Sequence, residues 1–109
     1  MLAKIYRLGR RDLLLVKQQG TRYKHKYFLA TVQPSDKPYS RFAVVVSTQV
    51  DKRSTVRNHL RRLIYDRLDP KAFGNRDLVL HLTPGVVHLS DAEVGSELDS
   101  FLSTLPRVS

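Results

Sequence analysis

The sequence predicts an α+β fold, a two-layer α/β sandwich in which three helices cover a mixed four-stranded sheet. Apolar residues recur at helical spacing in three segments, and the segments between them alternate or run continuously apolar, as strands do. The order is helix, two or three strands, helix, strand and helix, and we expect α-β-β-β-α-β-α. A chain of 109 residues has the length of one domain, which we place at residues 1–109.

The first elements are a short helix and a strand. Residues 10–18 form the helix, and Gly20 stands where a left-handed residue would end it. Residues 22–32 alternate as one strand. We expect it to have an apolar face made by Phe28, Ala30 and Val32, and a polar, aromatic face made by Tyr23, His25, Tyr27 and Thr31.

The middle of the chain predicts a buried strand and a second helix. Residues 41–48 centre on three consecutive valines, which indicates burial on both faces of a sheet. A helix follows at residues 54–68 and stops at Asp69 and Pro70. Its apolar stripe consists of Val56, Leu60, Leu63, Ile64 and Leu68.

The last third predicts a strand, a turn and a third helix. Residues 76–82 form another buried strand, and Thr83-Pro84-Gly85 turns the chain. Ser90 and Glu93 have the spacing of a capping box, which marks a helix start. The apolar stripe of this helix consists of Val94, Leu98, Phe101, Leu102 and Leu105, and Pro106 ends it.

Positive charge is concentrated in one part of the chain. Residues 1–76 hold 18 of the 19 Lys and Arg residues and five of the ten Asp and Glu residues, a net charge of +13. Residues 77–109 carry a net −4, which leaves +9 overall. A localised positive charge of this size favours a polyanion, since Lys and Arg bound to phosphates release condensed counterions.

The composition also excludes several classes. The sequence contains no cysteine, which removes disulfides and thiolate chemistry and favours the cytoplasm. Apolar runs such as Leu13 to Val16 are far shorter than the roughly 20 residues of a membrane-spanning helix, so we expect no membrane association. We expect no metal catalysis by the protein itself and assign no metal ligand, because no His-Glu-x-x-His motif occurs and the basic region has no carboxylate cluster.

The helix at residues 54–68 carries the clearest functional signal. At about 100° per residue, its polar side chains fall within an arc of about 140° opposite the apolar stripe. Residues 52–62 contain six basic side chains, counting His59, and no acid, whereas solvated helix faces usually mix charges. We therefore predict a nucleic-acid interface. The arc consists of Arg57, Asn58, Arg61, Arg62 and Tyr65.

This helix also resembles a known one. Ser54 to Asp66 is similar to the signature helix of the bacterial ribonuclease P protein subunit, whose usual form is Ala-Val-x-Arg-Asn-Arg-Ile-Lys-Arg-x-Ile-Arg-Glu. The similarity runs from Met1 to Leu105 and includes Arg7-Leu8 near the start and Asp77-Leu78-Val79 in the last strand.

The resemblance implies a subunit of an endoribonuclease that removes the 5′ leader of precursor tRNA. In that family the RNA, with Mg²⁺, performs the hydrolysis, so the protein alone should be inactive. The expected partners are the catalytic RNA and precursor tRNA, and no DNA. Contacts to the catalytic RNA are expected from Lys52, Arg53, Arg57, Asn58, His59 and Arg62. A leader cleft between the sheet face and this helix would involve Leu13, Lys17, Tyr23, Tyr27, Thr31, Arg61 and Tyr65.

Four of these positions depart from the family pattern. His59 replaces a usual Arg and is largely neutral at pH 7, which weakens one RNA contact or makes it pH-dependent. Leu13, Lys17 and Thr31 stand where aromatic residues are frequent. Aromatic faces for base stacking could come instead from Tyr23, Tyr27 and Tyr65. For the two strand tyrosines, ordinary β-propensity is an equally good explanation.

Two other functional classes fit parts of the sequence. His81-Leu82-Thr83 and His88-Leu89-Ser90 resemble paired elements of small phosphoesterases, but structural histidines around a Pro-Gly turn explain them better. A DNA-binding helix-turn-helix would need a helix just before Ser54, where the chain is β-branched. A ribosomal-type RNA-binding protein without a role in tRNA processing would have a similarly basic composition. Only the family resemblance separates that function from a role in tRNA processing.

Overall fold

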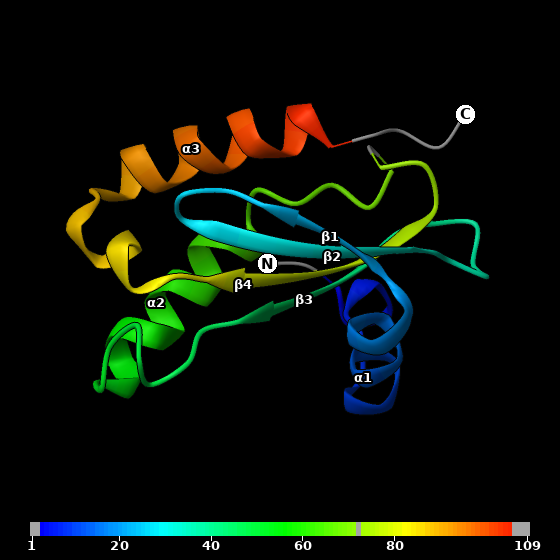
Figure 1. Ribbon diagram of the computed structural model, residues 1–109, viewed down its shortest axis with the longest axis horizontal. Coiled ribbons are helices and arrows are strands. Elements are labelled where there is room, and N and C mark those ends of the chain that lie inside the picture. Colours follow the sequence, from blue (N-terminus) through cyan, green and yellow to red (C-terminus); the bar gives the residue numbers. More distant parts are fainter. Residues whose placement is uncertain (1–2, 72, 106–109) are drawn as a thin grey trace.

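The computed structural model places three helices around a four-stranded sheet and describes residues 3–71 and 73–105 (Figure 1). The predicted α+β class and the order α-β-β-β-α-β-α are confirmed. The ends of the predicted domain, and Pro106 as the end of the last helix, lie outside the described residues. The elements are η1 (Lys4–Tyr6), α1 (Arg10–Gln19), β1 (Thr21–Lys24), β2 (Phe28–Pro34), β3 (Arg41–Val45), α2 (Ser54–Tyr65), β4 (Arg76–Leu82), η2 (Pro84–His88) and α3 (Asp91–Thr104).

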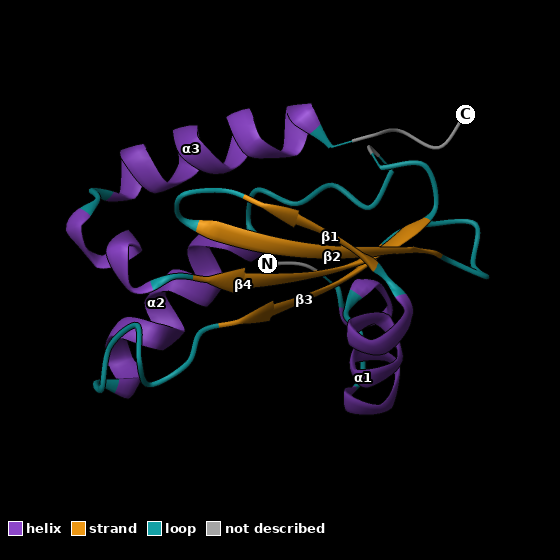
Figure 2. Ribbon diagram, viewed as in Figure 1, coloured by secondary structure: helices purple, strands orange, loops and turns teal. Residues whose placement is uncertain are grey.

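The last strand in the sequence lies inside the sheet. The strand order is β1-β2-β4-β3, so β4 separates β2 from β3 (Figure 2). β4 pairs antiparallel with β2 and parallel with β3. A parallel pair needs a crossover connection, and α2 provides it between β3 and β4.

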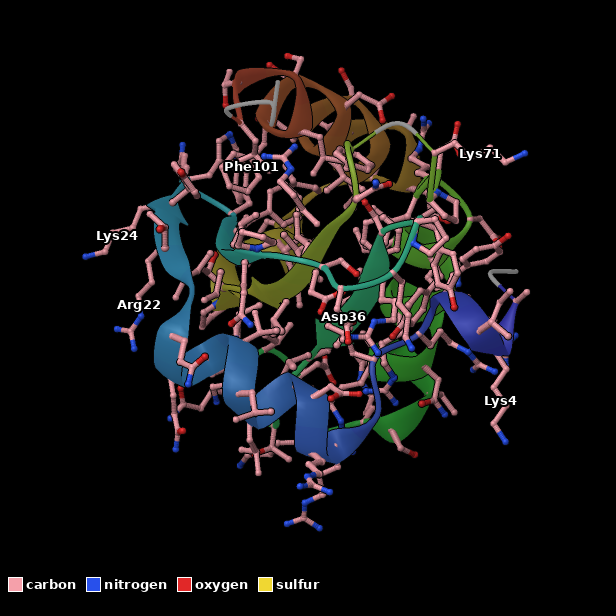
Figure 3. The ribbon with its side chains drawn as sticks, turned by 90° about the vertical axis from the view of Figure 1, so that its right-hand side faces the viewer. Lys4, Arg22, Lys24, Asp36, Lys71 and Phe101 are labelled. Carbon is pink, nitrogen blue, oxygen red and sulfur yellow. The ribbon has the colours of Figure 1, made fainter. Side chains whose placement is uncertain are left out.

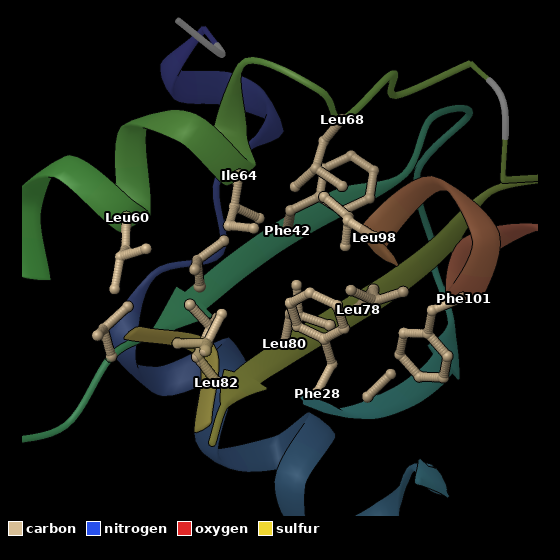
Figure 4. Packing of buried hydrophobic residues seen from close by; sticks show 14 of the residues in the cluster. Phe28, Phe42, Leu60, Ile64, Leu68, Leu78, Leu80, Leu82, Leu98 and Phe101 are labelled. Carbon is tan, nitrogen blue, oxygen red and sulfur yellow. The ribbon is translucent and has the colours of Figure 1, made fainter. Parts of the chain in front are cut away.

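The two faces of the sheet are covered differently. α2 and α3 pack on one face, where Phe28, Leu80, Ile64 and Leu98 form part of the main core (Figure 4). α1 lies on the opposite face from α3 (Figure 1), and its buried Val16 belongs to a smaller cluster with Leu8, Ala43 and Val79. The sheet therefore has one fully covered face and one face that carries a single helix.

The prediction of one continuous strand at residues 22–32 is wrong. The chain turns at residues 25–27, and β1 and β2 pair antiparallel with Tyr23 opposite Ala30. The backbone N–H of Tyr27 donates to Nδ1 of His25 at 3.2 Å within this turn. Because the turn reverses the chain, Tyr23 shares the core face with Ala30, and the predicted polar, aromatic face does not form.

The structure also corrects two predicted element boundaries and the predicted role of Gly20. The helix of residues 54–68 ends at Tyr65, because Arg67 and Leu68 donate their N–H groups to carbonyls three residues back, as in a turn. The strand of residues 41–48 ends at Val45. Gly20 is not left-handed, since its φ is −76°. Glycine fits this position because it has no side chain: an added Cβ would lie 2.7 Å from Thr31 Cγ2.

A buried ion pair joins the two parallel strands at the end where α1 begins. Arg41 donates from Nε to Asp77 Oδ1 at 3.1 Å and from Nη2 to Oδ2 at 2.8 Å. Its Nη1 donates to Asp12 Oδ2 of α1 at 3.3 Å. Hydrogen bonding to Asp77 raises the pKa of Arg41 above its usual value. One guanidinium thus links β3, β4 and α1.

Asp77→Ala should lower the free energy of unfolding by about 3 kcal/mol, because it leaves a mostly buried guanidinium without its main partner. Urea denaturation measures this change. Asp36→Ala is the matched control: the Asp36 side chain is 79% exposed and lies 3.7 Å from Arg41, so its loss should cost less than about 1 kcal/mol. Equal losses in the two variants would contradict the assignment of Asp77 as the main partner.

Candidate nucleic-acid interface

α2 buries its apolar side in the core and leaves its basic side at the surface. Leu60 and Ile64 are buried against the sheet and α3. Asn58 and Arg62 are exposed, and Arg61 is half-buried. The predicted division of this helix into an apolar stripe and a basic arc is therefore what the structure contains.

Side chains of α2 and the N-terminal segment line a hollow at the β3 edge, which we call the arginine hollow. It is lined by Arg7, Asn58, Arg61, Arg62 and Tyr65. Leu8, next to Arg7, is held to the sheet edge because its N–H donates to Phe42 O at 2.7 Å. Arg61 donates to Asn58 Oδ1. The described lining residues include three guanidinium groups and no carboxylate, a composition that suits a phosphate.

Tyr65 fixes the end of α2 against the sheet. Its Oη accepts a hydrogen bond from the backbone N–H of Val44 at 3.1 Å. The same side chain lines a second hollow with Lys4, Arg7 and Gly9, next to the first. Tyr65 therefore lies between two groups of basic residues, with part of its surface accessible.

The loop before α2 orders two more of the predicted RNA contacts. Arg57 Nη1 donates to the carbonyl oxygens of Lys52 at 2.8 Å and Asp51 at 3.1 Å. Arg53 donates to both carboxylate oxygens of Asp51, at 3.1 and 2.9 Å. These bonds lower the pKa of Asp51 to about 2. Arg57 keeps free donors, since a guanidinium carries five N–H groups.

His59 points toward α3. Its Nε2 lies 2.8 Å from Asp91 Oδ2, and both side chains are more than half exposed. His59 therefore sits beside a carboxylate at the start of α3 and is not part of the arginine hollow. Its predicted contact with RNA stays a prediction.

The structure divides the predicted leader-cleft residues among three places. Leu13 and Lys17 lie on α1, and Leu13 packs against the smaller cluster. Thr31 lies on the same side of the sheet but is only 2% exposed, beneath Gly20. Arg61 and Tyr65 line the arginine hollow. Tyr23 and Tyr27 pack against the main core.

Tyr23 and Tyr27 therefore do not share a surface with Leu13, Lys17 and Thr31. The prediction that these residues line one cleft is corrected in this respect, because the turn at residues 25–27 puts the tyrosines on the other face. Thr31 offers almost no surface to a ligand.

The sequence did not point to a group of residues on the face of the sheet that carries α1, in the part that α1 leaves uncovered. We call this face the α1 face. Leu29, His81 and Val45 lie side by side across β2, β4 and β3, and all three are half-buried. The one signal in the sequence was a polar residue, His81, inside the apolar strand of residues 76–82. Arg7 entered only through the family resemblance and not as a site residue.

Neither a metal cluster nor a membrane span emerges from the described residues. Within residues 3–71 and 73–105, no three His, Asp or Glu side chains are grouped to hold a metal ion. Across the same ranges, the helices are too short or too polar to cross a bilayer.

Comparison with known proteins connects this chain to one family. The family model described as ribonuclease P matches residues 2–106. A ribonuclease P protein component of Synechocystis sp. is 32% identical over 101 residues, which span 89% of this chain and 76% of that protein. Another, of Synechococcus sp., is 38% identical over 66 residues, and the match spans 57% of this chain and about half, 52%, of that protein.

Solved structures share the fold. The ribonuclease P protein of Thermotoga maritima superposes with a TM-score of 0.79 at 24% identity, over 92% of this chain and 97% of that one. The Staphylococcus aureus protein superposes with a TM-score of 0.83 at 15% identity, over 90% of this chain and 93% of that one.

Arg53→Ala should raise the pKa of Asp51 from about 2 part of the way toward its ordinary value of 3.8, because the side-chain hydrogen bonds from Arg53 are the largest cause of the low value. The backbone N–H at position 53, which donates to Asp51 Oδ1 at 2.8 Å, remains in the variant. An NMR titration of the carboxyl carbon measures the shift. A lowered pKa means that the pair stabilises the folded loop above about pH 4 and loses this effect as the pH falls toward 2.

Lys52→Ala, a change at the neighbouring exposed cation, should leave the pKa of Asp51 at about 2. A pKa that stays at about 2 in Arg53→Ala would show that the Arg53 side chain is not the cause.

Proposed function

Because this chain belongs to the ribonuclease P protein family and is a protein subunit of ribonuclease P, we propose that it binds the catalytic RNA through α2 and the arginine hollow. We propose further that it contacts the 5′ leader of precursor tRNA on the adjoining α1 face of the sheet. The observation that carries the proposal is the arginine hollow, where three guanidinium groups converge without a carboxylate among the described lining residues.

RNA phosphates fit this surface for a physical reason. Each planar guanidinium can donate two parallel hydrogen bonds to a phosphate, and Asn58 can both donate and accept. The loop that holds Arg53 and Arg57 orders these side chains before RNA arrives, so less side-chain entropy is lost on binding. Lys52 extends the same positive surface beyond the start of α2.

We assign the hydrolysis to the RNA and to Mg²⁺ ions that the RNA holds. The donors in the arginine hollow are guanidinium groups, which repel a divalent cation, whereas Mg²⁺ takes oxygen ligands such as phosphate. The protein's part is to lower the repulsion between two RNA molecules, which should let the holoenzyme work at lower Mg²⁺ concentration. The cytoplasm is the compartment we propose, on the ground of the cysteine-free sequence.

The rival functions have less support. His81 lies on the α1 face of β4 and His88 ends η2, and no contact between their rings occurs in the described part of the chain. A pair of catalytic histidines would have to share one substrate. No finding favours a ribosomal-type RNA-binding protein.

Reconstitution tests the proposed division of labour. With its cognate catalytic RNA, the protein should speed cleavage of precursor tRNA at Mg²⁺ concentrations where the RNA alone is slow, as followed by gel electrophoresis. Protein freed of RNA should leave precursor tRNA intact. Mg²⁺-dependent cleavage by the RNA-free protein, lost in His88→Ala, would favour the phosphoesterase alternative.

Arg62→Ala should weaken binding to the catalytic RNA and make it less salt-dependent. Loss of one phosphate contact should reduce the slope of log affinity against log salt concentration by about 0.7–0.9. Filter binding over a series of salt concentrations measures the slope. Lys71→Ala removes an exposed cation outside the arginine hollow and should leave the slope unchanged. An unchanged slope in Arg62→Ala would mean that Arg62 does not bind phosphate.

A further inference from the structure

One side chain in the basic region has a charge that depends on pH. Residues 52–62 contain five Lys and Arg side chains, whose charge is constant near neutral pH, and one histidine, His59. An ordinary imidazole changes its charge between pH 5 and 8. His59 lies on α2, one turn before Arg62, and is more than half exposed. RNA bound along α2 would therefore meet this imidazole beside constant positive charges.

Asp91 of α3 holds the His59 ring from one side. Nε2 of His59 lies 2.8 Å from Asp91 Oδ2. The first turn of α3 fixes the position of Asp91, because Ser90 and Glu93 form a capping box with hydrogen bonds of 2.9 and 3.2 Å. α3 lies on the opposite side of the sheet from α1 (Figure 3), so this contact is away from the α1 face. A second helix thus orients the ring.

The other ring nitrogen, Nδ1, has no hydrogen-bond partner within the residues that the structure describes. Of the α2 residues three or four positions from His59, Arg62 is the charged one. From α3, the carboxylate of Asp91 faces the ring. The short helix η2, which leads into α3, contributes one titratable residue, His88. Nδ1 is therefore available to a group outside the protein.

The protonation state of His59 decides what Nδ1 can bind. A neutral ring that donates from Nε2 to Asp91 has a lone pair on Nδ1, which repels a phosphate oxygen. A protonated ring donates from both nitrogens, so it can bond the carboxylate on one side and a phosphate on the other. Without the extra proton, a phosphate at this place would face a lone pair with a carboxylate behind it. Binding of a phosphate to His59 therefore requires a protonated ring.

We propose that Asp91 is a positioning residue that makes the contact between His59 and RNA depend on a proton. Asp91 accepts from Nε2, and the protonated ring donates from Nδ1 to a phosphate of the catalytic RNA. The proton comes from the solvent and returns to it when the RNA leaves. The inference rests on the proposed function, because the RNA meant is the one that binds along α2.

The first test compares the affinity for the cognate catalytic RNA at pH 6 and pH 8, at constant salt and Mg²⁺ concentrations. The original protein should bind about fivefold more tightly at pH 6, the gain expected from one exposed ion pair. His59→Arg has a constant charge, so its affinity should change by less than about twofold. Other histidines and the RNA itself contribute equally to both proteins, so the difference between the two proteins measures the effect of His59.

The second test separates the role of Asp91 from that of negative charge on α3 in general. Asp91→Asn keeps the shape of the side chain and should reduce the pH effect to less than about twofold. Asp99→Asn is the matched control, because Asp99 is a similarly exposed carboxylate of α3 that lies 2.9 Å from Arg67 instead of a histidine. This variant loses the same charge and should keep the pH effect of about fivefold.

Calorimetry gives a measurement that a merely structural role of Asp91 would not change. Titrations at pH 7 in two buffers with different enthalpies of ionisation report how many protons are taken up when the protein binds RNA. The original protein should take up more protons than His59→Arg, and Asp91→Asn should match His59→Arg. The thermal unfolding midpoint shows whether each variant is folded.

Three outcomes would overturn the proposal: an equal pH effect in the original protein and His59→Arg, a full pH effect in Asp91→Asn, or the same loss of the pH effect in Asp91→Asn and Asp99→Asn. If Asp91→Asn does not fold, the comparison of the original protein with His59→Arg still decides whether binding takes up a proton at His59. Failure of the proposed function looks different, because the original protein would then not prefer the catalytic RNA over unrelated RNA at either pH.

Discussion

The Arg41–Asp77 pair ties the first helix to the two parallel strands, and the surface that we propose for RNA depends on where that helix lies. Its guanidinium joins the beginnings of the two parallel strands and also reaches Asp12 near the start of α1. The helix is thereby held over one end of the sheet. The other end, with His81 at its centre, stays open. A single buried hydrogen-bonded charge pair thus links the stability of the fold to the shape of the surface.

Charge is separated by side of the molecule as well as by position in the sequence. Two acidic residues of α3 lie against basic side chains that face the helix: Asp99 lies 2.9 Å from Arg67, and Asp91 lies 2.8 Å from the imidazole of His59. The side with the arginine hollow has no such neighbours among the described residues that line it. Carboxylates of the acidic last third of the chain therefore lie on the side of α2 that faces α3. Guanidinium groups without a lining carboxylate lie on the side where α2 meets the N-terminal segment, among the residues that the structure describes.

Periodicity predicted the elements well and their faces less well. The helices of residues 10–18 and 54–68, the strand at 76–82 and the capping box of Ser90 were predictable because their signals are local. The β1–β2 turn was not, since His25-Lys26-Tyr27 contains no Gly, Asn or Pro to mark it. Missing one turn inverted the faces of Tyr23 and Tyr27. The uncovered part of the α1 face around His81 could not be predicted either, because its exposure depends on where α1 stops covering the sheet.

The central position of β4 has a consequence for how the chain folds as it is synthesised. Both β2 and β3 need β4 as a partner, yet β4 follows them and α2 in the sequence. Until the ribosome has released residues 76–82, α2 has no complete sheet to pack on, and the arginine hollow should not yet be formed. Contacts between distant parts of a chain form late in folding. Incomplete chains should therefore be poor competitors for the RNA, which leaves assembly to finished molecules.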